Sequence, residues 1–279
     1  MMAVPIPTIV LLHGQPDSSA SFWSLRRELG RRLPAGVRVL APDRPGYGAN
    51  LLPPTGYAGN LRWLQGWLER VEAGPTVLVG HSWAGGVTAL AAAQRPSWLA
   101  GLVLLASVGP GCLTPVDPLL AAPVLGNVLA YATLQLGRPI VRWQAESLII
   151  GTLAEQDRPY GRASGLAMRH RPIWRSFLIE QRALLRELPD IAAALSRITT
   201  PTVVITGSRD PLIPARTPIA LLAAVSHAMA CQLDGGHDLQ LRQPAEVAEV
   251  IGDFVATLAG FGWPPGGADL AGSAAAERA

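Results

Sequence analysis

The chain alternates short apolar runs, rich in β-branched residues, with longer segments of helical periodicity. Apolar runs of about four to eight residues are typical of strands buried on both faces, and the helices between them supply the crossovers that parallel strands need. We therefore predict an α/β fold with a doubly wound, mostly parallel sheet. The expected strands are residues 8–12, 37–41, 76–79, 102–106, 202–206 and 228–233, and the expected helices are 21–33, 57–71, 84–95, 215–224 and 245–258.

The alternation stops between Val108 and Thr200. This stretch carries prolines and tryptophans and has helical periodicity in patches such as 174–188, which predicts a helical cap inserted into the α/β core. A length of 279 residues favours one domain with an insertion. The predicted boundaries are 1–108 and 200–259 for the core, 109–199 for the cap, and 260–279 for a flexible tail rich in Gly, Ala and Pro.

The composition and net charge of the chain limit the reactions that it can catalyse and the kinds of molecule that it can bind. Charged residues make up 15% of the chain and the net charge is +3, which favours a packed globular enzyme over a nucleic-acid-binding protein. All 23 Lys and Arg residues are arginine, so Schiff-base chemistry on lysine is excluded. Cys112 and Cys231 show neither a disulfide framework nor a metal-ligand spacing, so we expect reduced thiols and no metal site.

Residues 118–137 carry no charge and have about the length of a membrane-spanning helix. Pro118, Pro123 and Gly126 interrupt this segment, and we interpret it as a buried or ligand-lining helical segment rather than a membrane span. The amino terminus lacks the positively charged start and small-residue cleavage site of a signal peptide. The sequence thus predicts a cytoplasmic protein.

The clearest chemical motif follows the predicted strand 76–79. Residues 80–86 read Gly-His-Ser-Trp-Ala-Gly-Gly and lead into a predicted helix. A serine on a tight strand-to-helix turn needs small neighbours, and this arrangement is a nucleophile elbow with Ser82 as the candidate nucleophile. The turn also directs the amide of Trp83 and the positive end of the helix at the place where an oxyanion would form.

A serine nucleophile needs a base that is held by an acid, and both are expected downstream in the order Ser, acid, His. Asp210 follows the predicted strand 202–206, and His237 follows the predicted strand 228–233. Parallel strands end at the same sheet edge, so Asp210 and His237 are expected beside Ser82. Asp234 and Asp238 are rival acids, but they are too close to His237 in sequence to reach the far ring nitrogen readily.

The first predicted strand ends in His-Gly-Gln-Pro at residues 13–16. This loop would also lie beside Ser82, and we predict that the backbone amide of Gln15 pairs with that of Trp83 as the oxyanion hole. His13 is interpreted as structural, because His237 already supplies the base.

These motifs resemble the α/β-hydrolase superfamily across nearly the whole chain outside the cap and tail. The resemblance implies a structural turn for Asp-Arg-Pro-Gly-Tyr-Gly at residues 43–48. The chain departs from the family in one respect: the hairpin that usually precedes the first strand is expected to be missing, which would leave one sheet edge shorter.

The loop at residues 13–16 and the tryptophan after the nucleophile are also similar to epoxide hydrolases and haloalkane dehalogenases, whose nucleophile is aspartate. Alkylated aspartate is an ester that water can cleave, whereas alkylated serine would be an ether. Ser82 therefore favours acyl substrates, and we predict a serine hydrolase that cleaves an ester, lactone or thioester of a small to medium hydrophobic molecule without a cofactor. The candidate pocket residues are Trp143, Trp174, Tyr131 and Tyr160, which either line the pocket or pack the cap onto the sheet.

Other functions fit the same triad. A carbon–carbon bond hydrolase or an aminopeptidase would differ only in its cap pocket, and a cofactor-free haloperoxidase or perhydrolase would form peracid from a carboxylic acid and peroxide. A ligand-binding module could keep the triad without turnover. Fold analogy alone does not choose among these functions.

Overall fold

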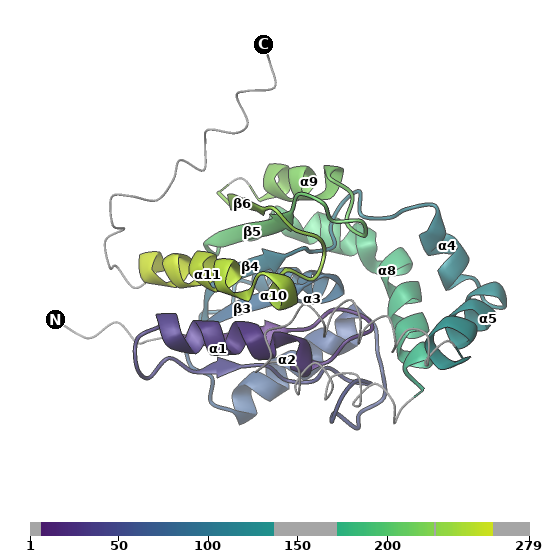
Figure 1. Ribbon diagram of the computed structural model, residues 1–279, viewed down its shortest axis with the longest axis horizontal. Helices are drawn as coiled ribbons and strands as arrows, with labels where there is room; N and C mark the ends of the chain where they lie inside the picture. Colours follow the sequence, from purple (N-terminus) through teal and green to yellow (C-terminus); the bar gives the residue numbers. More distant parts are fainter. Residues whose placement is uncertain (1–6, 137–171, 226, 259–279) are drawn as a thin grey trace, which may run out of the picture.

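The computed structural model describes residues 7–136, 172–225 and 227–258, and it places a six-stranded sheet at the centre of the protein (Figure 1). The strand order is β2-β1-β3-β4-β5-β6, and every neighbouring pair is parallel. The strands are β1 (Thr8–Leu12), β2 (Val39–Leu40), β3 (Thr76–His81), β4 (Leu99–Leu105), β5 (Thr202–Gly207) and β6 (Met229–Leu233).

Helices cover both faces of this sheet (Figure 1). One apolar layer packs the sheet against α1 (Trp23–Arg32), α10 (Leu239–Arg242) and α11 (Pro244–Leu258). The other packs it against α2 (Tyr57–Arg70), α3 (Trp83–Ala93), α8 (Ile173–Leu195) and α9 (Arg216–Ala224). The predicted doubly wound α/β fold is confirmed.

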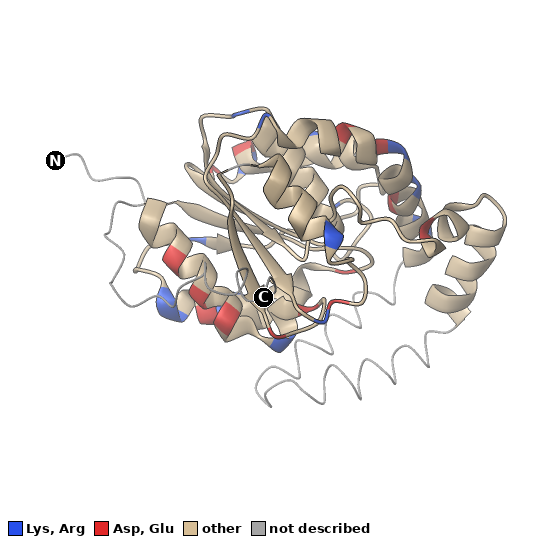
Figure 2. Cartoon of the chain, turned by 90° about the horizontal axis from the view of Figure 1, so that it is seen from above, with Lys and Arg blue, Asp and Glu red and all other residues tan. Residues whose placement is uncertain are grey.

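The separation of apolar and charged residues explains this arrangement. None of the strand residues is Asp, Glu, Lys or Arg, and these charged residues lie on the surrounding helices and loops (Figure 2). The side chains of β1 are fully buried except for Thr8, which is 4% exposed and donates through Oγ1 to the carbonyl of Ala73. Burial on both faces thus accounts for the continuous apolar runs in the sequence.

The register brings the carboxyl ends of the strands to one edge. Leu12 of β1 is paired with Gly80 of β3, and Gly207 of β5 is paired with Leu233 of β6. The loops that follow these four strands carry Gln15, Ser82, Asp210 and His237. The sheet therefore collects the candidate site residues at the edge where ligands bind in open α/β sheets.

Two elements differ from the sequence prediction. The strand expected at 37–41 is reduced to Val39–Leu40, which lies at the sheet edge and pairs only with β1 among the described residues. Helix α8 is longer than the expected patch 174–188 and continues through Pro189. Proline lacks the N–H that would bond to the carbonyl four residues earlier, yet the apolar stripe on both sides of it keeps the helix packed.

The segment 118–137 is largely helical in its described part, as predicted, but most of its large apolar side chains are exposed rather than buried, and the alternative that it lines a ligand site stays a prediction. It forms α4 (Val116–Ala121), α5 (Leu125–Tyr131) and a π-helical turn η2 (Ala132–Leu136), with Gly137 outside the described residues. Val124 is 76% exposed and Val128 is 60% exposed, although α4 and α5 contact α8 and Ala130 of α5 is buried. No helix in the described part of the chain is long and apolar enough to cross a membrane. Residues 260–279 lie outside the described residues.

Candidate active site

Ser82 lies on a sharp turn between β3 and α3. Its backbone has φ 53° and ψ −123°, in the region that favours glycine. Such a conformation costs about 1–3 kcal/mol and persists where the surroundings hold it. Here the Ser82 amide donates to the carbonyl of Leu105 at 2.9 Å, and the Ser82 carbonyl accepts from the amides of Gly85 at 3.0 Å and Val108 at 3.2 Å.

Glycines allow other chain segments to approach this turn closely. A Cβ on Gly80 would lie 2.3 Å from Thr88 Oγ1, and a Cβ on Gly14 would lie 2.9 Å from the Cβ of Ser82. The loop after β1 therefore contacts the elbow with its backbone. Gln15, whose amide is a predicted oxyanion donor, is the next residue along this loop.

The three predicted triad residues form one chain of hydrogen bonds. His237 Nε2 lies 2.9 Å from Ser82 Oγ, and His237 Nδ1 lies 2.8 Å from Asp210 Oδ2. The other carboxylate oxygen of Asp210, Oδ1, accepts hydrogen bonds from the backbone amides of Leu212 at 2.8 Å and Ile213 at 2.9 Å. An ionised Asp210 assigns the proton of the neutral imidazole to Nδ1, so Nε2 is free to accept the serine proton.

Electrostatics support this assignment. Burial works to raise the pKa of Asp210, but the hydrogen bond and charge of His237 and the two backbone donors lower it overall. The carboxylate stays ionised at neutral pH. The side chains of His237 and Asp210 are 10% and 5% exposed, so the pair is largely shielded from water.

His81 lies directly beside the candidate base. Its ring centroid is 5.0 Å from that of His237, and its Nε2 lies 3.3 Å from the His237 carbonyl oxygen. Burial and the neighbouring His237 lower the pKa of His81 to about 3. A neutral His81 therefore adds no competing positive charge next to His237.

The two predicted oxyanion donors come from different chain segments, the loop after β1 and the start of α3. Trp83 is the first residue of α3, where backbone N–H groups have no partner within the helix. Gln15 follows the loop from β1 whose carbonyls are held by Arg44: Nε donates to the His13 carbonyl at 2.7 Å and Nη2 to the Gly14 carbonyl at 2.7 Å. Among the described residues no hydrogen bond occupies the amide of Gln15 or Trp83.

The structure adds residues that the sequence interpretation did not select. Arg44 and Glu180 form a fully buried ion pair, and Gln15 Nε2 donates to Gln181 Oε1 at 2.9 Å. Glu180 lies on the apolar stripe of α8 between Ile173 and Leu184, where a carboxylate is unusual. A carboxylate on an apolar helix face was the feature of the sequence from which Glu180 could have been selected.

The predicted pocket residues are only partly described. Tyr131 of α5 and Trp174 of α8 pack edge to face with ring centroids 5.5 Å apart, and Tyr131 is 43% exposed. This contact joins α5 to α8, in keeping with a packing role. Trp143 and Tyr160 lie outside the described residues.

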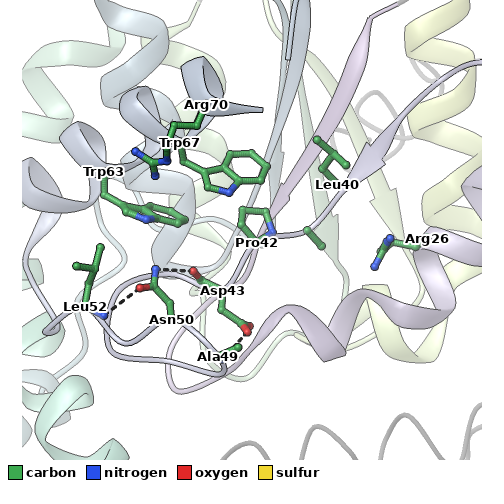
Figure 3. Close-up of a pocket in the computed structure, with 11 residues that line it drawn as sticks. Arg26, Leu40, Pro42, Asp43, Ala49, Asn50, Leu52, Trp63, Trp67 and Arg70 are labelled. Atoms are coloured by element: carbon green, nitrogen blue, oxygen red, sulfur yellow. Dashed lines mark hydrogen bonds between the residues drawn. The ribbon is translucent and has the colours of Figure 1, made fainter. Parts of the chain in front are cut away.

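A separate cavity of about 490 Å³ lies at the β2 edge of the sheet (Figure 3). Asp43, Asn50 and Leu52 line it from the loop after β2, and Trp63, Trp67 and Arg70 line it from α2. Ser82, Asp210 and His237 are not part of it. This surface feature is thus distinct from the candidate site.

The described residues offer no cluster of three or more His, Cys, Asp or Glu side chains that could hold a metal ion. Cys112 and Cys231 are buried free thiols, and burial raises the pKa of each.

Comparison with known proteins decides the family. The sequence profile of the alpha/beta hydrolase family matches residues 9–250. The chain belongs to this family. Among curated relatives, this hydrolase is 28% identical over 252 residues to 2-hydroxymuconate semialdehyde hydrolase from Pseudomonas sp. (strain CF600), covering 89% of this chain and 86% of the relative.

Solved structures agree on the fold. The hydrolase is similar to a thermophilic esterase from Thermogutta terrifontis with a TM-score of 0.70 and 22% identity, covering 91% and 90% of the two chains. It is also similar to a bromoperoxidase from Bacillus anthracis with a TM-score of 0.69 and 21% identity, covering 90% and 92%. These identities support the shared fold alone.

Proposed function

We propose that this alpha/beta hydrolase is a serine hydrolase that cleaves an ester, lactone or thioester bond of a small to medium hydrophobic substrate. The observation that carries the proposal is the unbroken hydrogen-bond chain from Asp210 through His237 to Ser82, with the serine on a strained elbow. The helices between β4 and β5 are assigned as a cap over this edge. No cofactor enters the reaction.

In the first step Ser82 Oγ attacks the substrate carbonyl carbon while His237 Nε2 takes the serine proton. The carbonyl oxygen becomes an oxyanion and accepts hydrogen bonds from the Gln15 and Trp83 amides. When the tetrahedral intermediate collapses, the bond to the leaving group breaks and His237 returns the proton to the leaving oxygen or sulfur. An acyl-Ser82 ester remains.

In the second step a water molecule attacks this ester. His237 accepts a proton from the water, the second tetrahedral intermediate collapses, and the proton returns to Ser82 Oγ as the acid leaves. Asp210 stabilises the transient imidazolium and keeps the ring in the productive orientation. Each catalytic cycle thus consumes one water and restores the triad.

A second candidate function has support from the relatives. 2-Hydroxymuconate semialdehyde contains no ester, so the hydrolase of that name must break a carbon–carbon bond next to a carbonyl group. A serine triad can perform that cleavage when the departing carbon accepts a proton. This activity at Ser82 is the main alternative to ester cleavage.

A fluorophosphonate probe tests the nucleophile and base together. We expect the natural protein to be labelled on the peptide that contains Ser82, and we expect Ser82→Ala and His237→Ala to lose the label while keeping their melting temperatures. Absence of label on the folded natural protein would favour a ligand-binding module without turnover.

A substrate panel then separates the bond classes. Faster turnover of p-nitrophenyl esters, lactones and thioesters than of 2-hydroxymuconate semialdehyde would support ester cleavage. The reverse order would establish the carbon–carbon hydrolase. Aminoacyl anilides test the aminopeptidase, and peracid formation from acetate and hydrogen peroxide tests the perhydrolase.

A further inference from the structure

Glu180 on helix α8 is linked to both segments of the predicted oxyanion hole, directly to Trp83 and through Arg44 to the loop before Gln15. Its backbone carbonyl accepts a hydrogen bond from Trp83 Nε1 at 3.1 Å. Its carboxylate pairs with Arg44, whose other donors hold the loop that precedes Gln15. One residue outside the sheet thereby links the two chain segments that would supply the oxyanion donors.

Arg44 acts on Gln15 through a shared peptide plane. The Gly14 carbonyl and the Gln15 N–H belong to the same planar trans peptide unit and point in opposite directions. Arg44 Nη2 holds the Gly14 carbonyl at 2.7 Å, and Arg44 Nε holds the preceding His13 carbonyl at 2.7 Å. These two bonds fix the orientation of the plane and therefore the direction of the Gln15 N–H.

The Trp83 side is held by packing around the same pair of residues. The Arg44 guanidinium lies 4.6 Å from the centre of the Trp83 ring, and Tyr57 stacks on the ring at a centroid distance of 4.0 Å. The indole N–H is anchored on Glu180. The Trp83 side chain has little freedom to turn, which in turn fixes its backbone at the start of α3.

The contacts of the Arg44–Glu180 pair orient the groups around it as well as packing against them. Both side chains are 0% exposed, and Tyr47 Oη donates to Glu180 Oε2 at 2.7 Å. The Glu180 charge raises the pKa of Arg44 despite the opposing effect of burial. Arginine presents its donors in a fixed plane, so one side chain can hold the carboxylate and two carbonyls together, which a lysine ammonium cannot reproduce.

We propose that Arg44 and Glu180 are positioning residues that set the spacing and direction of the Gln15 and Trp83 amides, coupling helix α8 to the oxyanion hole. This inference rests on the proposed acyl transfer at Ser82. Substitutions at the pair should then reduce the rate of steps that form an oxyanion and leave ground-state binding nearly unchanged.

The decisive variant is the double substitution Arg44→Met/Glu180→Leu. It removes both buried charges while keeping apolar volume, a replacement that proteins often tolerate. We expect kcat on a p-nitrophenyl ester and the rate constant of fluorophosphonate labelling to fall together by about 30- to 300-fold, near the effect of losing one oxyanion donor. KM should stay within about threefold, and the melting temperature should fall moderately, because the His13 and Gly14 carbonyls and the Tyr47 hydroxyl lose their buried partners.

Arg38→Met is the matched control. Arg38 also donates to two consecutive backbone carbonyls, those of Val71 and Glu72, at 3.0 and 3.1 Å, but it is exposed and belongs to the β2 edge. Its substitution should leave both rate constants unchanged. A purely structural role for buried arginine would not separate kcat from KM in this way.

Arg44→Lys keeps the test decisive if the double variant does not fold. Lysine retains the charge opposite Glu180 but loses the planar donor set, so we expect a folded protein whose kcat and labelling rate are still reduced by about tenfold or more. Natural-like rates in either folded variant would overturn the inference while leaving the proposed function standing. An unlabelled and inactive natural protein would instead overturn the proposed function, and this inference with it.

Discussion

The two halves of the candidate site are held in different ways. Asp210 and His237 follow adjacent strands β5 and β6, and the Asp210 carboxylate is held by its own loop through Leu212 and Ile213. The oxyanion half depends on side chains from distant segments, since Arg44 and Glu180 are separated by 136 positions. The base half thus follows from sheet topology, whereas the oxyanion half depends on a helix outside the sheet.

The largest expected effect lies in the base half. Asp210→Asn keeps the shape of the side chain but no longer stabilises the imidazolium or selects the Nδ1–H tautomer, so kcat should fall by about 10³- to 10⁴-fold, as in other serine triads. The melting temperature should change little. Steady-state kinetics on an ester measure the effect, and a loss below about tenfold would show that another group orients His237.

Substitutions in the oxyanion half should lower the free energy of unfolding more than substitutions in the base half. Arg44→Met alone leaves the Glu180 carboxylate buried without its partner, which typically costs about 3–5 kcal/mol. Urea unfolding of Arg44→Met and of the Arg38→Met control measures the free energy of unfolding. A loss for Arg44→Met that matches the control would contradict the view that a buried charge pair joins α8 to the loop after β1.

Asp17 offers a pH-dependent test on the oxyanion side. Burial, with a contribution from Asp238, raises the pKa of Asp17 from 3.8 to about 7, although Ser21 and Ser18 donate to it. Between these values the unfolded chain loses the proton and the folded protein keeps it, so stability falls as pH rises from about 4 to about 7. Asp17→Asn should therefore raise the free energy of unfolding by about 4 kcal/mol at pH 8, since one pKa unit corresponds to about 1.4 kcal/mol, and leave it nearly unchanged at pH 4.

Chemical denaturation of natural protein and Asp17→Asn at both pH values provides the measurement. The difference between them should grow steadily across this interval, because asparagine does not titrate. A difference that is the same at pH 4 and pH 8 would mean that folding does not raise the pKa of Asp17.

The smallest effect is expected at the rival acid in the base half. Asp234 is 76% exposed in its side chain and is paired with Arg209 rather than with His237. Asp234→Asn should leave kcat and KM unchanged on the same ester used for Asp210→Asn. A loss of kcat comparable to that of Asp210→Asn would reverse the assignment of the acid.

Sheet topology explains why much of the site could be predicted from the sequence. Ser82, Asp210 and His237 each come shortly after an apolar run, and parallel runs end at one edge. Their order along the chain and their residue types then limit the arrangements that could form a triad. The hydrogen bonds among them match that prediction in geometry.

The link from Arg44 to Glu180 could not be found in the same way. Periodicity marks Glu180 as a carboxylate on an apolar helix face, but it does not identify the partner among 23 basic residues. The burial predicted for segment 118–137 was also wrong for most of its large apolar side chains. An uncharged run shows that a segment has low polarity, but it does not show which other segments cover it. Long-range side-chain pairing and helix packing require coordinates.

The sheet order has a consequence for folding. Ser82, Asp210, His237 and the loop of Gln15 follow β3, β5, β6 and β1, and β4 lies between β3 and β5, so five of the six strands must be in register before the site exists. Parallel pairings between distant segments form slowly, since each closes a long loop. No fragment or partly folded intermediate lacking one of these strands can be active. The recovery of enzymatic turnover during refolding would therefore measure the number of fully folded molecules. The circular dichroism signal of the helices could recover earlier than the activity.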